Sequence, residues 1–440
     1  MRVETTGLFR WTGALASLTP DDTRALFDRG SSTNGSVATR VSEIIARVRT
    51  GGDAALRALC AELDGVSISA LEIGADALET ALASIDPELR RVLSRAADNI
   101  RRVHEAFMPV AQETESEAGV LIGRRPDALG RVGIYAPGGR AAYPSSVLMG
   151  VIPAHVAGVR EIILCTPPLR ETGQPSDVVL AAAKLSGATR VFALGGAGAV
   201  AAMAYGTESV PRVDRIVGPG NAYVAEAKIQ VASAVAIDSP AGPSELLILA
   251  DDTADTEVIA RELLAQAEHD PLAAVVAVLG SPELALRVER AVAELMVSQP
   301  RAAICAAALR GQGAVLWAGT PDDAIAFANR YAAEHLLLLS ADEDVVLRQL
   351  RNAGTVFLGQ YASVAFGDYM SGANHVLPTG GLARSYSGLS TLDFVRWTTY
   401  QRISRAAAAE MANDVGLFAD SEGLGGHALA ARAWAQEVRA

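Results

Sequence analysis

Continuous apolar runs of strand length alternate with helical segments through the middle of the chain, and this alternation limits the possible folds. The run at residues 161–165 is a typical case, ended by Pro167 and Pro168. A strand that is apolar on both faces needs helices on both sides, as in a parallel sheet. Because the alternation restarts after Pro243, the sequence predicts an α/β protein with two domains. The expected strands are 161–165, 190–194, 214–217, 246–250, 273–279, 314–317, 336–339 and 355–358.

The segments that flank this region are expected to be mainly helical. Residues 119–135 instead predict two strands, joined as a hairpin through residues 126–130. Residues 364–390 are rich in glycine and proline, and a long ordered loop of this kind is usually functional. The last fifty residues return to helix, with Ser421 as a possible cap. The expected N-terminal helices are residues 21–28, 37–48, 53–63 and 87–107.

Composition excludes several classes of protein. The chain has 440 residues, of which 50% are hydrophobic, so it can bury more than one core. A net charge of -12 argues against nucleic acid as a partner. No segment predicts a signal peptide or a membrane span, and the three scattered cysteines are typical of a reducing compartment. We therefore expect a soluble, cytoplasmic protein.

Four of the six histidines lie in the second half of the chain, each close to a carboxylate or an amide. His104 and His155 lie on expected helices and are assigned to structure. Gln266 and His269 are one turn apart on a helix that Pro271 ends, so both can reach one cation. Imidazole, amide and carboxylate donors without thiolates suit zinc in a catalytic role. The four pairs are Gln266 and His269, Glu334 and His335, Asp368 and His375, and Glu422 and His427.

Three glycine turns follow expected strands, at residues 135–140, 195–198 and 218–221. Each can direct backbone N–H groups and a helix N-terminus at an anion, which favours a cofactor that carries phosphate. Residues 196–201 also fit the spacing of the dinucleotide fingerprint. However, the acid expected at the end of the next strand is missing, because Asp214 precedes that strand.

Eight motifs occur in order along nearly the whole chain, and together they resemble the histidinol dehydrogenase family. They are YAPGG at 135–139, YPSSVLM at 143–149, IVGPGN at 216–221, AGPSE at 241–245, QAEHDP at 266–271, EHL at 334–336, NHVLPTGG at 374–381 and EGLGGH at 422–427.

The resemblance implies that the chain oxidises L-histidinol through the aldehyde to L-histidine, reduces two NAD per turnover and binds one zinc per subunit. It also implies a homodimer whose active sites are shared between subunits, and two incomplete Rossmann-like domains. The domains implied are an N-terminal arm (1–27), a domain with the zinc and catalytic residues (28–134 and 246–389), an NAD-binding domain (135–245) and a C-terminal tail (390–440).

The same resemblance assigns a role to individual residues. His335 would be the base that removes the alcohol proton, and Glu334 would activate the water that attacks the aldehyde. The zinc ligands and His335 would also contact the substrate. The zinc ligands would be Gln266, His269, Asp368 and His427; further substrate contacts would come from Ser244, His375 and Glu422, and cofactor contacts from Tyr135 and Asn221.

One residue departs from the family pattern, because Gly198 stands where the family usually has glutamine in the cofactor domain. This departure leaves room for a paralogous dehydrogenase that acts on another small alcohol or diol. A zinc hydrolase without nicotinamide and a binding protein without catalytic activity are further alternatives. The intact Glu334–His335 pair argues against the binding protein, and retention of His375 and Glu422 favours a substrate with an imidazole.

Overall fold

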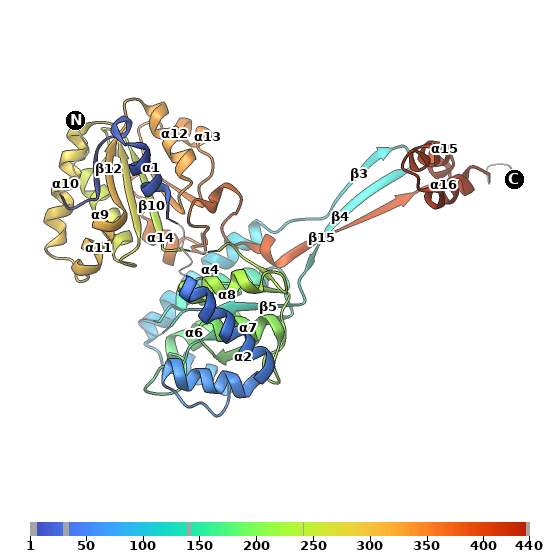
Figure 1. Cartoon of the computed structure of the whole chain (residues 1–440), viewed down its shortest axis with the longest axis horizontal. Helices are drawn as coiled ribbons and strands as arrows, with labels where there is room; N and C mark the ends of the chain where they lie inside the picture. The colour runs from blue at the N-terminus through green and yellow to red at the C-terminus, as the bar shows by residue number, and fades with distance from the viewer. Residues whose placement is uncertain (1–6, 30–34, 139–141, 241, 437–440) are drawn as a thin grey trace. The chain divides into compact units, whose positions relative to one another are not determined.

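The computed structural model describes residues 7–29, 35–138, 142–240 and 242–436. It divides into two compact units. Unit 1 comprises residues 1–106 and 130–394, and unit 2 comprises residues 107–129 and 395–440. Most strands pair in parallel and helices lie on both faces of the large sheets (Figure 1), which confirms the predicted α/β class.

The first sheet of unit 1, sheet A, is entirely parallel, with the strand order β1-β12-β11-β10-β13-β14. Every residue of β10 and β11 is buried, as expected for strands covered on both faces. The strands are β1 (Trp11–Ala14), β10 (Glu245–Ala250), β11 (Ala274–Leu279), β12 (Gly313–Trp317), β13 (His335–Leu339) and β14 (Thr355–Leu358).

The second sheet of unit 1, sheet B, has the order β2-β7-β6-β5-β8-β9. Only β2 is antiparallel to its neighbour. The strands are β2 (Glu72–Ile73), β5 (Arg131–Tyr135), β6 (Glu161–Thr166), β7 (Arg190–Ala193), β8 (Arg215–Val217) and β9 (Ala236–Ile237).

The two sheets repeat one topology. Numbered from β10, five strands of sheet A lie in the order 3-2-1-4-5, and the strands of sheet B numbered from β5 lie in the same order. This is the Rossmann order without its sixth strand among the described residues. Each sheet gains one strand from earlier in the chain, next to its third strand. The structure therefore shows a repeated topology that the sequence alone does not reveal.

Helices from distant parts of the chain cover both faces of each sheet. Sheet A has one core with α9, α10, α11 and α14 and another with α1 and α12. Sheet B packs against α2, α7 and α8 on one face. The helices so far are α1 (Pro20–Phe27), α2 (Gly35–Leu59), α7 (Gly196–Tyr205), α8 (Ala222–Val231), α9 (Thr256–Ala267), α10 (Pro282–Met296), α11 (Ala302–Gln312), α12 (Pro321–Tyr331) and α14 (Val364–Tyr369).

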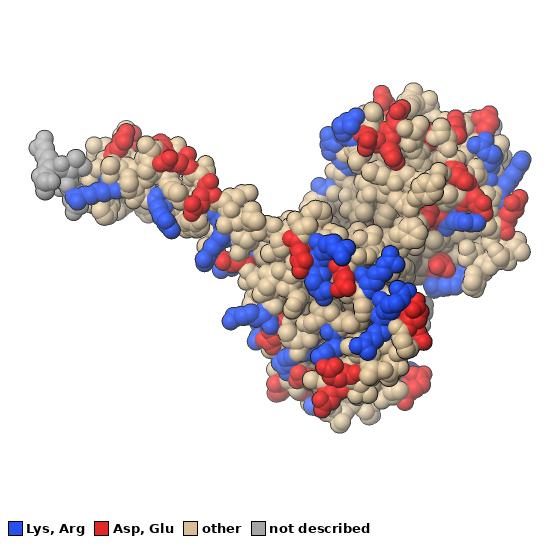
Figure 2. All heavy atoms as spheres, turned by 180° about the vertical axis from the view of Figure 1, so that it is seen from behind, with Lys and Arg blue, Asp and Glu red and all other residues tan. Residues whose placement is uncertain are grey.

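The remaining helices of unit 1 complete these layers. Helices α4 and α6 pack on α5, and α3 packs on α6. Arginines of α4 such as Arg90 and Arg95 are exposed. Acidic and basic side chains are interspersed over most of the face in Figure 2. These helices are α3 (Ala75–Ser84), α4 (Pro87–Ala106), α5 (Pro144–Val156), α6 (Asp177–Ser186) and α13 (Glu343–Gln349).

Unit 2 is a small body built from two distant segments. Its antiparallel sheet has the order β15-β4-β3, and a pair of helices follows β15. No helix in the described part of the chain is long and apolar enough to cross a membrane. The elements are β3 (Gln112–Glu117), β4 (Val120–Ala128), β15 (Val395–Ile403), α15 (Arg405–Ser421) and α16 (Gly425–Arg432).

Two expectations about local structure are wrong. The expected hairpin across residues 126–130 does not form, because β4 pairs with β3 and β15 while β5 joins sheet B. Ser421 ends α15 and does not cap the last helix.

The expected domain boundaries also differ. The segment 28–134 does not belong with sheet A, because α2 packs on α7 and α8 and β2 pairs with β7 of sheet B. The C-terminal segment of unit 2 begins at residue 395 and not at residue 390. Unit 2 also includes residues 107–129. Local apolar patterns identify strands and helices but do not indicate which sheet a segment joins.

His104 on α4 is buried, and neither ring nitrogen has a hydrogen-bond partner. Burial lowers the pKa of His104 to about 4. This pKa is below that of the unfolded chain. The contribution of His104 to the free energy of unfolding is therefore fully present above the unfolded pKa and is lost as the pH falls towards 4.

We predict that His104→Leu, which has a similar volume and no titrating group, reduces the loss of stability in acid. The free energy of unfolding of the natural chain should fall by roughly 2 kcal/mol more between pH 7 and pH 5 than that of the variant. Urea unfolding at both pH values measures this difference. Equal losses in the two proteins would show that His104 is not the group responsible.

Candidate active site

The two motifs that carry Ser244 and Glu334 lie side by side at the amino ends of neighbouring strands. Ser244 precedes β10, Glu334 precedes β13, and Leu246 is paired with His335 across the two parallel strands. Strands β10 and β13 flank the point where the strand order of sheet A reverses. Ligands in such sheets normally bind at the carboxyl ends of the strands, so sheet A places these residues at the opposite end.

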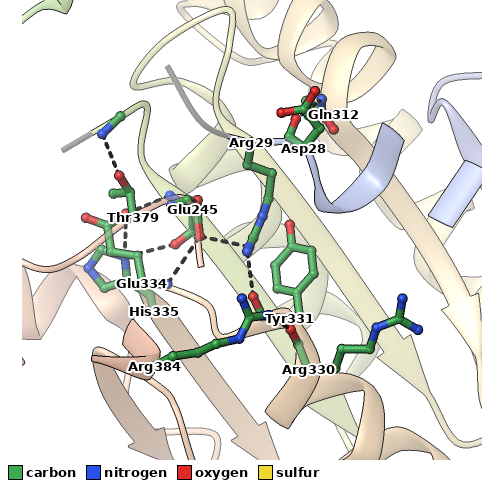
Figure 3. Close-up of polar contacts among 12 residues, drawn as sticks. Asp28, Arg29, Glu245, Gln312, Arg330, Tyr331, Glu334, His335, Thr379 and Arg384 are labelled. Atoms are coloured by element: carbon green, nitrogen blue, oxygen red, sulfur yellow. Dashed lines mark hydrogen bonds and ion pairs between the residues drawn. The ribbon is translucent and has the colours of Figure 1, made fainter. Parts of the chain in front are cut away.

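Glu245, the first residue of β10, connects the members of this cluster (Figure 3). Its backbone N–H donates to Glu334 Oε2 over 2.7 Å, and its carbonyl oxygen lies 3.0 Å from His335 Nδ1. Its side chain is fully buried and forms an ion pair with Arg29 at 2.8 Å. Burial raises the pKa of Glu245 to about 7, although Arg29 opposes this shift.

The contacts of His335 fix its tautomer. Because Nδ1 donates to the carbonyl oxygen of Glu245, the neutral ring carries its lone pair on Nε2. Nε2 lies 3.6 Å from Asp368 Oδ1, too far for a hydrogen bond, and has no other partner. Burial opposes protonation of the ring, but the carboxylates of Glu334 and Asp368 outweigh it and raise the pKa of His335 to about 10.

Asp368 on α14 gathers imidazoles around one carboxylate. His375 Nδ1 donates to the carbonyl oxygen of Asp368 over 3.0 Å, which leaves its Nε2 as the acceptor. Burial lowers the pKa of His375, so this ring is neutral at pH 7. Although burial opposes its ionisation, three imidazoles hold the pKa of Asp368 below its usual value; they are His335, His375 and His269.

Gln266 and His269 stand at the end of α9, as the sequence predicts. Gln266 is 2% exposed and its amide Nε2 has no hydrogen-bond partner, whereas His269 is exposed. Among the residues that the structure describes, no three His, Cys, Asp or Glu side chains converge as a metal site. Glu422 and His427 belong to unit 2 and are exposed there.

A second site lies at the carboxyl ends of the strands in sheet B, as a cavity of about 530 Å³. Tyr135, Gly198 and Asn221 all line it, so the structure brings together the three expected cofactor residues. The Tyr135 hydroxyl accepts a hydrogen bond from the N–H of Gly196 over 3.1 Å. Asn221 caps α8 through its Oδ1, which leaves its Nδ2 free to donate to a ligand.

Comparisons with known proteins point to one family. The family model described as histidinol dehydrogenase matches residues 27–434. A histidinol dehydrogenase of Methanosarcina barkeri is 46% identical over 95% of this chain and 96% of that protein. A histidinol dehydrogenase of Halobacterium salinarum is 48% identical over 94% of this chain and 97% of its own.

The chain belongs to the histidinol dehydrogenase family. The crystal structure of the histidinol dehydrogenase from Elizabethkingia anophelis, which is 32% identical, superposes with a TM-score of 0.93 and covers 98% of both chains. The α/β architecture described above is therefore that of the family.

Arg29 and Glu245 are the residues of this site that sequence reasoning missed. Glu245 lies in a motif quoted above, and a carboxylate that opens a wholly apolar strand signals a buried charge. No local pattern around Arg29 indicates its contact with Glu245, which is 216 residues away.

Gly198 lies on α7 with an ordinary helical backbone, and a Cβ there would meet Leu59 at 3.5 Å and Leu56 at 3.7 Å. These are normal contacts, so the backbone does not require glycine. A longer side chain at this position, such as glutamine, would enter the cavity that Gly198 lines.

We predict that Gly198→Gln lowers the KM for NAD by about 2- to 10-fold, the effect of one added hydrogen bond. The KM for the alcohol substrate should stay unchanged. Gly198→Ala adds a Cβ without the amide and is the matched control. Steady-state kinetics measure both constants, and equal effects of Gln and Ala would contradict a cofactor contact.

Proposed function

We propose that this chain is a zinc- and NAD-dependent histidinol dehydrogenase that oxidises L-histidinol through L-histidinal to L-histidine. The observation that carries the proposal is the assembled Glu334–His335 pair, in which His335 presents an unpartnered Nε2. The family membership reported above supports the substrate, since relatives across nearly the whole chain bear this name.

In the first oxidation, His335 Nε2 accepts the hydroxyl proton of the alcohol as the hydride leaves its carbon. The carbonyl oxygen of Glu245 stabilises the imidazolium through Nδ1–H. The carboxylates of Glu334 and Asp368 both raise the pKa of His335. If Asp368 serves as a metal ligand, its share of this effect is lost and the ring becomes a better base near pH 7.

In the second oxidation, Glu334 takes a proton from the water that adds to the aldehyde. Its Oε2 already accepts the backbone N–H of Glu245, which fixes the direction of the carboxylate. Tyr135 and Asn221, which line the cavity of sheet B, would hold NAD, and this cofactor would supply the hydride acceptor for each oxidation. The water oxygen ends in the carboxylate of the product, and two NADH are formed.

Gln266, His269 and Asp368 would hold zinc together with His427. Amide oxygen, imidazole and carboxylate ligands suit this metal. The ligand atom of Gln266 would be Oε1, and its Nε2 has no hydrogen-bond partner that would hold the amide in another orientation. Zinc, when bound, would orient the nitrogen groups of the substrate and polarise its hydroxyl. Ser244, His375 and Glu422 would complete the contacts to the substrate.

The active site would be shared by two subunits, because Glu422 and His427 come from unit 2. Unit 2 exposes large apolar side chains that a partner subunit would cover. They include Leu417, Phe418, Leu429 and Trp434, each more than half exposed in the single chain.

The proposal is tested by following NADH formation with L-histidinol, NAD and zinc, and separately with L-histidinal. His335→Asn should slow the first oxidation by about 10²- to 10⁴-fold, because it removes the base. Glu334→Gln should slow oxidation of the aldehyde far more than oxidation of the alcohol, since only the second step needs an activated water.

The control is the natural chain, which should form two NADH per histidinol. Absence of NADH would refute the proposed function, and NADH formation with another small alcohol alone would favour the paralogous dehydrogenase. Equal losses in both oxidations for Glu334→Gln would show that the two roles are divided wrongly.

The shared site predicts that two inactive variants complement one another. His335→Asn and His427→Ala, unfolded together and refolded with zinc, should regain roughly a quarter of the natural activity. Half of the dimers are mixed, and each mixed dimer has one site made only of intact residues. Each variant refolded alone is the control. If every chain builds its own site, the mixture stays inactive.

A further inference from the structure

We propose that Arg29 and Glu245, a buried ion pair, are positioning residues for the reaction. They hold Glu334 and His335 in place. The inference rests on the proposed function, because it concerns the same pair of acid–base residues. Neither Arg29 nor Glu245 faces the substrate in this account. They act through the backbone at the starts of two strands (Figure 3).

The guanidinium of Arg29 forms hydrogen bonds near the starts of both β10 and β13, one from each terminal nitrogen. Nη1 donates to Glu245 Oε2 on the first residue of β10. Nη2 donates over 2.5 Å to the carbonyl oxygen of Tyr331, which ends α12 three residues before Glu334. The guanidinium also stacks on the Tyr331 ring, with Cζ 3.5 Å from its centre. The spacing between the two strand starts therefore depends on a planar group that a lysine cannot replace.

Glu245 adds a third anchor with its second carboxylate oxygen. Oε1 accepts the N–H of Gly380 over 2.6 Å, in the loop that also carries His375. The two oxygens thus serve three donors, because Oε2 also accepts the N–H of Glu334 over 3.4 Å. Because an amide has only one oxygen, glutamine at position 245 would turn its NH₂ towards one of these donors. One anchor would be lost even in the most conservative substitution.

The backbone of Glu245 transmits this arrangement to both functional side chains. Its N–H fixes the Glu334 carboxylate, and its carbonyl oxygen fixes the His335 tautomer. A displaced β10 start therefore disturbs both oxidations, unlike Glu334→Gln. The pair is 1–2% exposed, and buried ion pairs are often no more stabilising than apolar side chains of similar volume. Stability alone does not account for a charged pair in this position.

The test uses Glu245→Gln, Arg29→Lys and the double variant Arg29→Met with Glu245→Leu, in the full-length protein with zinc. We expect kcat to fall at least tenfold in both oxidations, with the KM for NAD changed less than threefold. The double variant removes both charges and should recover thermal stability relative to the single variants while remaining slow. A purely stabilising pair would instead regain activity along with stability.

A second readout does not depend on turnover. Nitrogen-15 NMR of labelled histidine, with His335→Asn to assign the signal, should show one Nδ1–H signal of His335, hydrogen-bonded to the Glu245 carbonyl oxygen, in the natural chain. Glu245→Gln and Arg29→Lys should replace this signal by a mixture. The matched control is Asp53→Asn in α2, a buried carboxylate that accepts hydrogen bonds from Thr207 and Ser209. It should lower stability without changing kcat or the His335 signal.

The outcomes separate the two proposals. If the natural chain forms no NADH from histidinol, the proposed function fails, and the NMR signal alone decides the positioning role. If the variants lose stability but keep the natural kcat and an unchanged His335 signal, the positioning role is refuted and the function stands.

Discussion

A carboxylate buried at the start of β10 sets the arrangement of the functional half of this protein. Glu245 cannot stay ionised in an apolar sheet unless a cation and backbone donors reach it. Arg29 supplies the charge from the N-terminal segment, and Gly380 supplies a donor from the loop after α14. The need to satisfy one buried charge therefore holds the segments of Arg29, Glu245 and Gly380 together beside Glu334 and His335.

The repeated topology gives the two halves of unit 1 different tasks. Sheet B follows the general rule for α/β sheets, with glycine turns and a cavity at the carboxyl ends of its strands. Sheet A places Ser244, Glu334 and His335 at the amino ends of β10 and β13. A carboxyl edge presents helix N-termini, which suit phosphates. The amino ends of β10 and β13 carry the acid–base side chains of Glu334 and His335 instead. The same strand order therefore carries a cavity at the carboxyl ends of sheet B and a cluster of acid–base residues at the amino ends of sheet A.

Links between the two halves include asparagine side chains, and the strands of sheets A and B do not join in one sheet among the described residues. Asn374 donates to the carbonyl oxygen of Met149 on α5, and Asn99 on α4 donates to that of Met370. Both contacts hold the loop between α14 and β15, which carries His375 and follows Asp368. The loop is ordered by hydrogen bonds to the helices of sheet B, although its functional residues face those of sheet A.

The sequence by itself determined the α/β class, most strands and helices, and the family, because apolar periodicity and motifs of several residues are local signals. It also predicted a functional role for four histidines, since each lies close to a carboxylate or an amide. Only the tertiary structure decided which sheet each N-terminal segment joins, as β2 and β5 show, and that residues 107–129 pair with the tail. It alone revealed the partnership of Arg29 with Glu245. Strand pairing and buried charge compensation depend on residues hundreds of positions apart, so no local pattern encodes them.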